Sequence, residues 1–142
     1  MTRILGLDVG GRRTGVAISD DFGVVATPVG FVLRGPRDRA EFRTLVDRYG
    51  AGEIVAGMPT GMSGREGPQA ADVRAYAEGL AADLDLPLAF YDERFTSTIA
   101  ERALVARGMK RDKRREQIDA VAAAVMLQSY LDAQAYRRQR GR

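Results

Sequence analysis

Residues 2–19 read TRILGLDVGGRRTGVAIS, and the predicted fold begins from the two strand patterns in this segment. Residues 2–9 and 14–19 are short runs rich in aliphatic and β-branched side chains, with two glycines between them. A third run of this kind, interrupted by Pro28, covers residues 24–33. Because turn residues separate the three runs at hairpin spacing, the sequence predicts a meander of three strands.

The chain then alternates between helical and strand patterns. A helix is predicted over 36–49, with Ala40, Leu45 and Val46 near one face and Gly50 at its end. A strand over 53–57, a Gly/Pro-rich loop over 58–67 and a helix over 68–84 are predicted next. A strand over 88–91 follows, and then a short helix opened by a capping box of Thr98 and Glu101. The chain ends with a basic loop over 107–115 and a helix over 115–135. This order predicts an α/β fold: a mixed sheet with helices on both faces.

The length of 142 residues suits one domain, which we expect over residues 1–136. The chain contains no histidine and no cysteine, which excludes a histidine general base, a Ser-His-Asp triad, a cysteine nucleophile and the usual zinc sites. Carboxylates are the remaining acid–base groups, and they prefer hard cations such as Mg²⁺ or Mn²⁺. No signal peptide or membrane-spanning run is apparent, so we expect a cytoplasmic protein.

The positive charge is concentrated in two short segments. Residues 107–115 (RGMKRDKRR) hold six basic side chains and one acid, and residues 137–142 (RRQRGR) hold four arginines. The remaining residues carry 12 basic and 18 acidic side chains. A basic patch on an acidic body is typical of a protein that binds phosphate backbones. For 137–142 alone, a solvated C-terminal tail is the simpler interpretation.

Three carboxylates occupy positions that invite a functional interpretation. Asp8 lies among apolar strand residues, where burying a charge is costly, although a strand-end turn cap is equally plausible. Glu93 follows a strand, where ligand sites gather, and only it or its neighbour Asp92 can face Asp8. Asp119 begins a nearly apolar helix, where it is either a favourable partner for the helix N-terminus or a metal ligand.

Together, these acids predict a metal centre. Asp8, Glu93 and Asp119 can all reach the same sheet edge, and three close carboxylates repel unless a cation neutralises them. Two divalent ions held there could organise an attacking water and stabilise the leaving oxygen in phosphodiester cleavage. This chemistry needs no histidine.

Four segments in this order resemble the YqgF/RuvX family: LGLDVGGRRTGVAISD, VAGMPTGMSGREGPQA, YDERFTS and QIDAVAAAVMLQSYL. This family is assigned to nucleolytic processing of precursor 16S ribosomal RNA and is also described as resolvase-like, acting on Holliday junctions. The resemblance implies an RNase H-like fold, with a five-stranded sheet whose first three strands are antiparallel. It also implies that Asp8, Glu93 and Asp119 are the catalytic residues and the ligands of Mg²⁺ or Mn²⁺.

Several positions are candidates for substrate contact. The glycines of GMPTGMSGREG let a phosphate approach the backbone, although a flexible connection uses glycine equally well. One basic residue just beyond Asp8 is also expected to bind substrate, and the sequence does not choose between the two arginines there. The substrate-binding candidates are Arg12, Arg13, Thr60, Ser63, Arg65, Lys110, Arg111, Lys113, Arg114 and Arg115.

Three other functions compete with an RNA nuclease. DVGGRRTG also resembles the first phosphate motif of sugar kinases and actin-like ATPases, but those need two lobes and a second phosphate motif. A non-catalytic RNA-binding factor in ribosome maturation would leave the acids idle in a phosphate-binding cleft. A Holliday junction resolvase acting on branched DNA would use the same chemistry, usually as a symmetric dimer. Monomer and homodimer both remain open.

The basic run gives the first prediction. Replacing Lys113, Arg114 and Arg115 together with alanine should weaken binding to nucleic acid and flatten its dependence on salt, because fewer counterions are released. Binding measured across a series of salt concentrations tests this. A salt slope equal to that of the wild type would remove the run from the substrate path.

Overall fold

A computed structural model describes residues 2–59, 67–95 and 118–141 of the chain. Its elements are β1 (Arg3–Val9), β2 (Arg13–Ser19), β3 (Ala26–Leu33), α1 (Asp38–Tyr49), β4 (Ala51–Met58), α2 (Pro68–Leu84), β5 (Leu88–Asp92), the single 3₁₀ turn η1 (Glu93–Phe95) and α5 (Ile118–Arg140). No helix in these ranges is long and apolar enough to cross a membrane.

The five strands form one mixed sheet in the order β3-β2-β1-β4-β5. β1 pairs antiparallel with β2, and β2 pairs antiparallel with β3, so the predicted meander is confirmed. β1 pairs parallel with β4, and β4 pairs parallel with β5. Pro28 is tolerated because β3 lies at an edge of the sheet, where one side of the strand needs no hydrogen-bonding partner.

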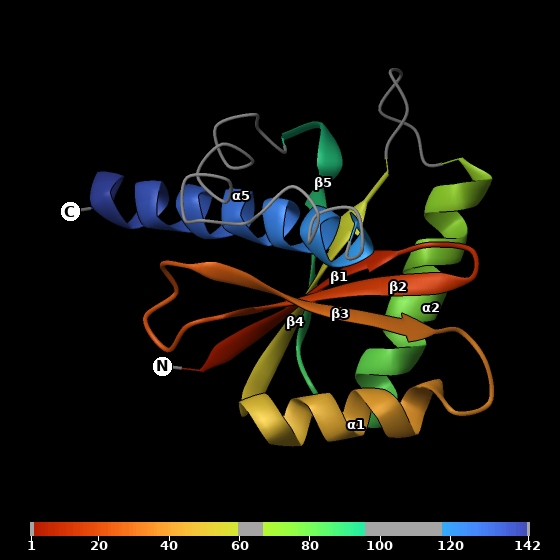
Figure 1. The fold of residues 1–142 in the computed structure, drawn as a ribbon. Coiled ribbons are helices and arrows are strands. Elements are labelled where there is room, and N and C mark those ends of the chain that lie inside the picture. The colour runs from red at the N-terminus through yellow and green to blue at the C-terminus, as the bar shows by residue number, and fades with distance from the viewer. Residues whose placement is uncertain (1, 60–66, 96–117, 142) are drawn as a thin grey trace.

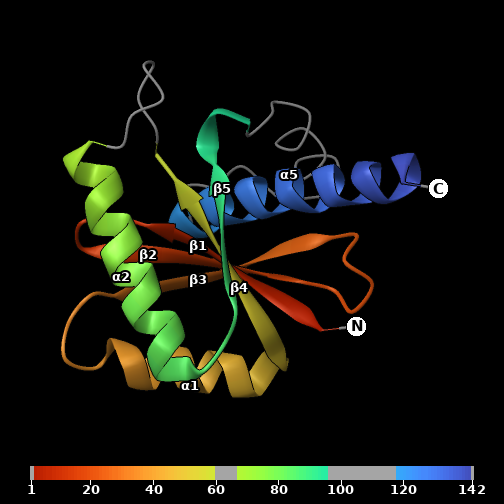
Figure 2. The same cartoon turned by 180° about the vertical axis from the view of Figure 1, so that it is seen from behind.

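Helices cover both faces of the sheet, as Figures 1 and 2 show, with α1 and α2 on one side and α5 on the other. The period of two along β1 divides its side chains between the faces. Leu5 and Leu7 are fully buried in the larger core, which includes residues of α1 and α2. Ile4 packs in the smaller core under α5, and Asp8 shares this face of β1.

The α5 face of the sheet is built from very small residues. Gly6 lies so near the helix that a Cβ there would be 3.0 Å from the Cβ of Leu127. Ala17 of β2 packs against Ala123 and Ala124 of α5 in the same cluster. A Cβ at Gly15 would lie only 1.9 Å from the carbonyl oxygen of Asp119. The absence of a side chain at Gly15 therefore allows the first turn of α5 to lie against β2.

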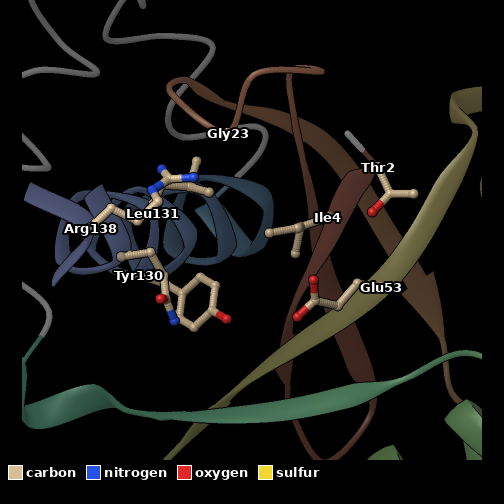
Figure 3. A pocket seen from close by; sticks show the side chains of 8 residues that line it. Thr2, Ile4, Gly23, Glu53, Tyr130, Leu131 and Arg138 are labelled. Atoms are coloured by element: carbon tan, nitrogen blue, oxygen red, sulfur yellow. The ribbon is translucent and has the colours of Figure 1, made fainter. Parts of the chain in front are cut away.

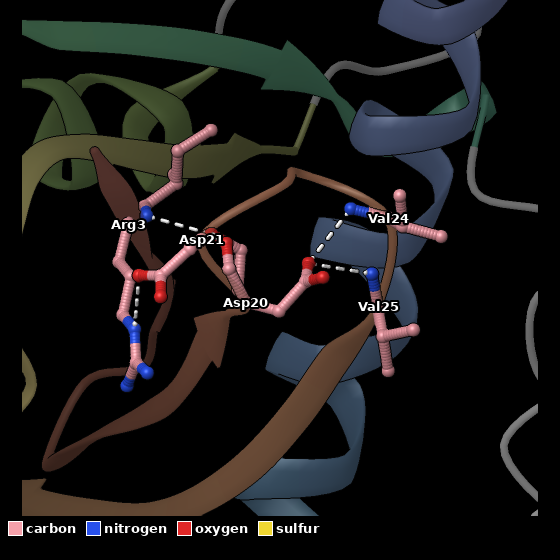
Figure 4. Close-up of polar contacts among 7 residues, drawn as sticks. Arg3, Asp20, Asp21, Val24 and Val25 are labelled. Carbon is pink, nitrogen blue, oxygen red and sulfur yellow. Dashed lines mark hydrogen bonds and ion pairs between the residues drawn. The ribbon is translucent and has the colours of Figure 1, made fainter. Parts of the chain in front are cut away.

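Polar contacts also fix the middle of α5 to the β2–β3 hairpin. The Asp20 carboxylate accepts hydrogen bonds from the amides of Val24 (2.7 Å) and Val25 (3.0 Å), which closes the turn (Figure 4). The buried Gln128 side chain of α5 donates to the Val24 carbonyl (2.8 Å) and accepts from the Ala26 amide (2.9 Å). These hydrogen bonds therefore hold the helix in a fixed position against the hairpin.

The prediction of the first helix needs correction. The first helix begins at Asp38, and its buried face is Asp38, Phe42 and Val46, so the prediction that Ala40 lies on that face is wrong. The burial of Asp38 is tolerated because Tyr76 of α2 donates a hydrogen bond to its carboxylate (2.6 Å). Apolar periodicity does not reveal this contact. Gly50 ends the helix in a left-handed conformation, as predicted.

The last helix is longer than predicted. It continues past the expected end at residue 135 to Arg140, so most of the basic segment 137–142 is helical. The predicted capping box at Thr98 and the basic loop 107–115 lie outside the described residues.

The glycine face gives the second prediction. Gly15→Ala should lower the free energy of unfolding by about 1–3 kcal/mol, because α5 has to move away from the sheet to admit the methyl group. Gly35→Ala is the matched control, since nothing lies within 4 Å of a Cβ at that position. Urea unfolding of both variants provides the measurement. Equal stability of the two would show that the close approach of α5 is unimportant.

Candidate active site

The three predicted carboxylates come from three different elements at one end of the sheet. Asp8 lies near the end of β1 and pairs with Gly15 of β2. Glu93 opens the η1 turn directly after β5, and Asp119 lies in the first turn of α5. All three are partly exposed, so solvent and ligands can reach them.

Asp8 and Glu93 are in direct contact. Their side chains lie within hydrogen-bonding reach of each other, and such a bond forms only when one of the two acids is protonated. Gly57 of β4 makes the contact possible, because a Cβ there would lie 2.9 Å from Oε1 of Glu93. The pairing of Leu7 with Ala56, carried one residue further, puts Gly57 next to Asp8 in the sheet. Glycines therefore flank Asp8 on both neighbouring strands.

Burial and mutual repulsion change how these two acids titrate. Burial raises the pKa of Glu93 to about 7, and the negative charges of Asp8 and Asp92 contribute in the same direction. Burial also raises the pKa of Asp8, and the charge of Asp119 adds to this, while the hydrogen bond with Glu93 opposes it. The pair is therefore unfavourable as two carboxylates in the absence of a cation.

Asp119 is close enough to act on Asp8 but is paired elsewhere. Its carboxylate forms an ion pair with the guanidinium of Arg13 (Nε–Oδ2 3.1 Å). The same guanidinium lies 5.1 Å from the centre of the Phe31 ring. In this arrangement, no three acids among residues 2–59, 67–95 and 118–141 are grouped closely enough to hold one metal ion. The structure thus brings two of the three predicted ligands together, with the third beside them.

Asp92 is turned to a different partner. It binds Arg94 through a side-chain ion pair (2.6 Å) and also accepts a hydrogen bond from the Arg94 amide (2.9 Å). The expectation that only one of Asp92 and Glu93 joins Asp8 is therefore confirmed, and Glu93 is the one.

A shallow cleft adjoins the acids, lined by Gly10, Gly11, Arg12, Arg13, Leu33 and Asp119. Arg34 holds the Gly10–Gly11 turn of this cleft in place. Its guanidinium donates a hydrogen bond to the Gly10 carbonyl (3.0 Å) and forms a bidentate ion pair with Asp72 of α2 (2.8 and 3.1 Å). Nothing lies within 4 Å of a Cβ at Gly11, so the backbone of this turn is open to a ligand.

The two candidate arginines differ in their surroundings. Arg13 is paired with Asp119, whereas Arg12 is exposed, lines the cleft and has no ion pair within the part of the chain that the structure describes. The other predicted substrate contacts lie outside the described residues: Thr60, Ser63, Arg65, Lys110, Arg111, Lys113, Arg114 and Arg115.

A second cavity lies toward the other end of α5, between Ile4, Glu53, Tyr130 and Arg138 (Figure 3). Tyr130 follows Asp119 by eleven helical residues, which is roughly 16 Å along the helix axis. Among the described residues that line it, Glu53 is the one carboxylate, so this part of the lining lacks the group of acids near the cleft.

Sequence reasoning missed the residues that shape the site. Gly15 and Gly57 were not singled out, although glycine within a strand is a known sign of close backbone approach. Arg34 was also missed, because its partners Gly10 and Asp72 are far apart in the sequence.

Comparisons with known proteins agree with this geometry. The family model described as "RuvX: Holliday junction resolvase" matches residues 2–133. A protein of Moorella thermoacetica named "Putative pre-16S rRNA nuclease" is 46% identical over 132 residues, which cover 92% of this chain and 94% of the relative. A Chloroflexus aggregans protein of the same name is 47% identical, with 92% and 93% covered.

Two solved structures share the fold. RuvC of T. thermophilus in complex with a Holliday junction superposes with a TM-score of 0.58 at 16% identity, with 95% of this chain and 96% of that chain covered. The fowlpox virus resolvase with junction DNA gives a TM-score of 0.55 at 12% identity, with 92% and 97% covered. The predicted RNase H-like fold, with its first three strands antiparallel, is therefore confirmed.

The raised pKa of Glu93 gives the third prediction. Between pH 4.5, its ordinary pKa, and about 7, the folded protein keeps a proton that the unfolded chain has lost. The free energy of unfolding in EDTA should therefore fall as the pH rises through this range and then level off. Glu93→Gln should reduce this slope, which urea unfolding at a series of pH values can measure. An equally steep slope in Glu93→Gln would contradict the proton shared by Asp8 and Glu93.

Proposed function

The chain belongs to the RuvX family, and from this membership and the geometry of its acids we propose that it is a divalent-metal-dependent nuclease. The observation that carries the proposal is the contact between Asp8 and Glu93, with Asp119 close enough to raise the pKa of Asp8. Burying acids in mutual contact destabilises a fold, so a functional use is the better explanation. The catalytic residues are Asp8, Glu93 and Asp119.

The donor set suits a hard cation such as Mg²⁺ or Mn²⁺. All three candidate ligands offer carboxylate oxygens, and a cation beside Asp8 and Glu93 would offset the repulsion that raises their pKa values. Asp119 would join them by exchanging its ion pair with Arg13 for the cation. Arg13 thus neutralises Asp119 in the cation-free protein and becomes available to a phosphate when the cation is bound.

The chain's own residues orient the substrate and the acids. A bound divalent cation would activate water and offset the charge that develops on the phosphate oxygens. Asp8 is held rigidly between two strands, and Glu93 is held by the turn after β5. The open backbone at Gly11 and the exposed guanidinium of Arg12 would bind the phosphate next to the acids. Arg65 and the basic run 107–115 are expected to bind further phosphates of the nucleic-acid backbone.

The substrate we propose is precursor 16S ribosomal RNA. Two relatives named for a nuclease of this RNA are 46% and 47% identical to the chain, and the match covers nearly their whole length. Branched DNA is the second candidate, supported by the family description as a Holliday junction resolvase. The acids and the chemistry would be the same for both substrates.

Cleavage assays give the fourth prediction. Wild-type protein should cut one of two matched substrates, a precursor-rRNA-like strand or a four-way DNA junction, in Mg²⁺ or Mn²⁺ but not in EDTA. Asp8→Asn should cut at least about a hundredfold more slowly, because it removes a charge that stabilises the reacting centre. The substrate that is cut decides between RNA processing and junction resolution.

Asp92→Asn is the matched control, because Asp92 is the neighbouring acid but is paired with Arg94. It should keep most of the activity, and Asp8→Asn should remain folded by circular dichroism. Tight binding without cleavage in either metal would favour a non-catalytic RNA-binding factor. Full activity of Asp8→Asn would disprove the assignment of the site.

A further inference from the structure

Two large apolar side chains are exposed on the edge strand β3. Phe31 is 48% exposed and Leu33 is 60% exposed, while Val32 between them is 3% exposed. The alternation puts Phe31 and Leu33 on the same face of the sheet and Val32 in the core on the other. Neither Phe31 nor Leu33 belongs to a core cluster formed by the described residues. Packing within this part of the chain therefore does not account for them.

Strand register places Phe31 on the side of the acids. Phe31 pairs with Gly15, and Gly15 pairs with Asp8, so the three form one row across neighbouring strands. Two strand spacings separate Phe31 from Asp8, which is roughly 10 Å. Because Gly15 has no side chain, the backbone of Asp119 lies over it, so the first turn of α5 stands between the ring and Asp8 on this row. Leu33 lines the same cleft as Asp119.

Charge around the ring suits a nucleotide. The Arg13 guanidinium lies 5.1 Å from the centre of the Phe31 ring, and Arg12 lines the adjoining cleft. An apolar ring beside cationic groups matches the two halves of a nucleotide, a flat base and an anionic phosphate. A base within a duplex has its faces covered by its neighbours, so only an unpaired base could use the ring.

We propose that Phe31 and Leu33 form a platform on which one unpaired base of a single-stranded substrate stacks, beside the bond that Asp8, Glu93 and Asp119 cleave. This inference rests on the proposed nuclease function and adds a preference for single-stranded segments. Phe31 supplies the ring, Leu33 the apolar floor toward the cleft, and Arg13, whose guanidinium lies over the ring, a positive charge.

The chain contains no tryptophan, so Phe31→Trp introduces a single fluorescent reporter at the platform. Titration with a short single-stranded RNA, in EDTA and again with Mg²⁺ in the Asp8→Asn background, should quench this fluorescence as a base stacks on the indole. A matched DNA strand shows whether the platform distinguishes the two sugars. The same strand in duplex form should quench far less. Equal quenching by single strand and duplex would overturn the proposal.

Affinity measurements under these conditions separate the possible failures. Phe31→Ala should weaken binding of the single strand about tenfold and leave duplex binding nearly unchanged. Phe22→Ala is the control, because Phe22 is 72% exposed but lies in the β2–β3 loop, away from the cleft. Leu33→Ala should show a smaller loss in the same direction.

Wild-type protein that binds no nucleic acid would refute the nuclease function itself. Wild-type binding that Phe31→Ala leaves intact would refute only the platform. A self-association that Phe31→Ala abolishes, without any effect on nucleic-acid binding, would also overturn it by showing that a second copy covers the two side chains.

Discussion

The close packing of α5 against glycines of the sheet is the constraint on which the site depends. Gly6 and Gly15 leave room for the helix on β1 and β2, and Gly57 leaves room for the Glu93 side chain on β4. A residue of ordinary size at Gly15 would meet the backbone of Asp119 itself. Because a glycine lies on each side of Asp8, acids from three elements can approach one another above a single strand position.

This arrangement accumulates negative charge that the protein only partly relieves. The raised pKa of Glu93 favours a protonated form that lowers its repulsion with Asp8, and the ion pair with Arg13 offsets the charge of Asp119. In the proposed function, a divalent cation would bind the same oxygens and replace both the proton and the ion pair. The freed Arg13 would then lie between the acids and the Phe31 ring.

Patterns within single segments made much of the fold predictable. The three-strand meander and the helix over 68–84 follow from local apolar periodicity and turn residues, so they could be predicted from the sequence. The buried face of α1 could not be predicted, because the burial of Asp38 depends on a hydrogen bond from Tyr76, which is distant in the sequence. The difference between Arg12 and Arg13 depends on the ion pair with Asp119, which is likewise a long-range contact.

We propose that Asp8, Glu93 and Asp119 together bind a divalent cation. Calorimetric titration of Mn²⁺ near pH 6, repeated in buffers of different ionisation enthalpy, measures both binding and the protons released. We predict saturable binding that releases a proton, because Glu93, with a pKa of about 7, must lose it to become a ligand. Saturable binding should be lost in Asp8→Asn. Absence of binding by the wild type, or equal binding by Asp8→Asn, would contradict the account.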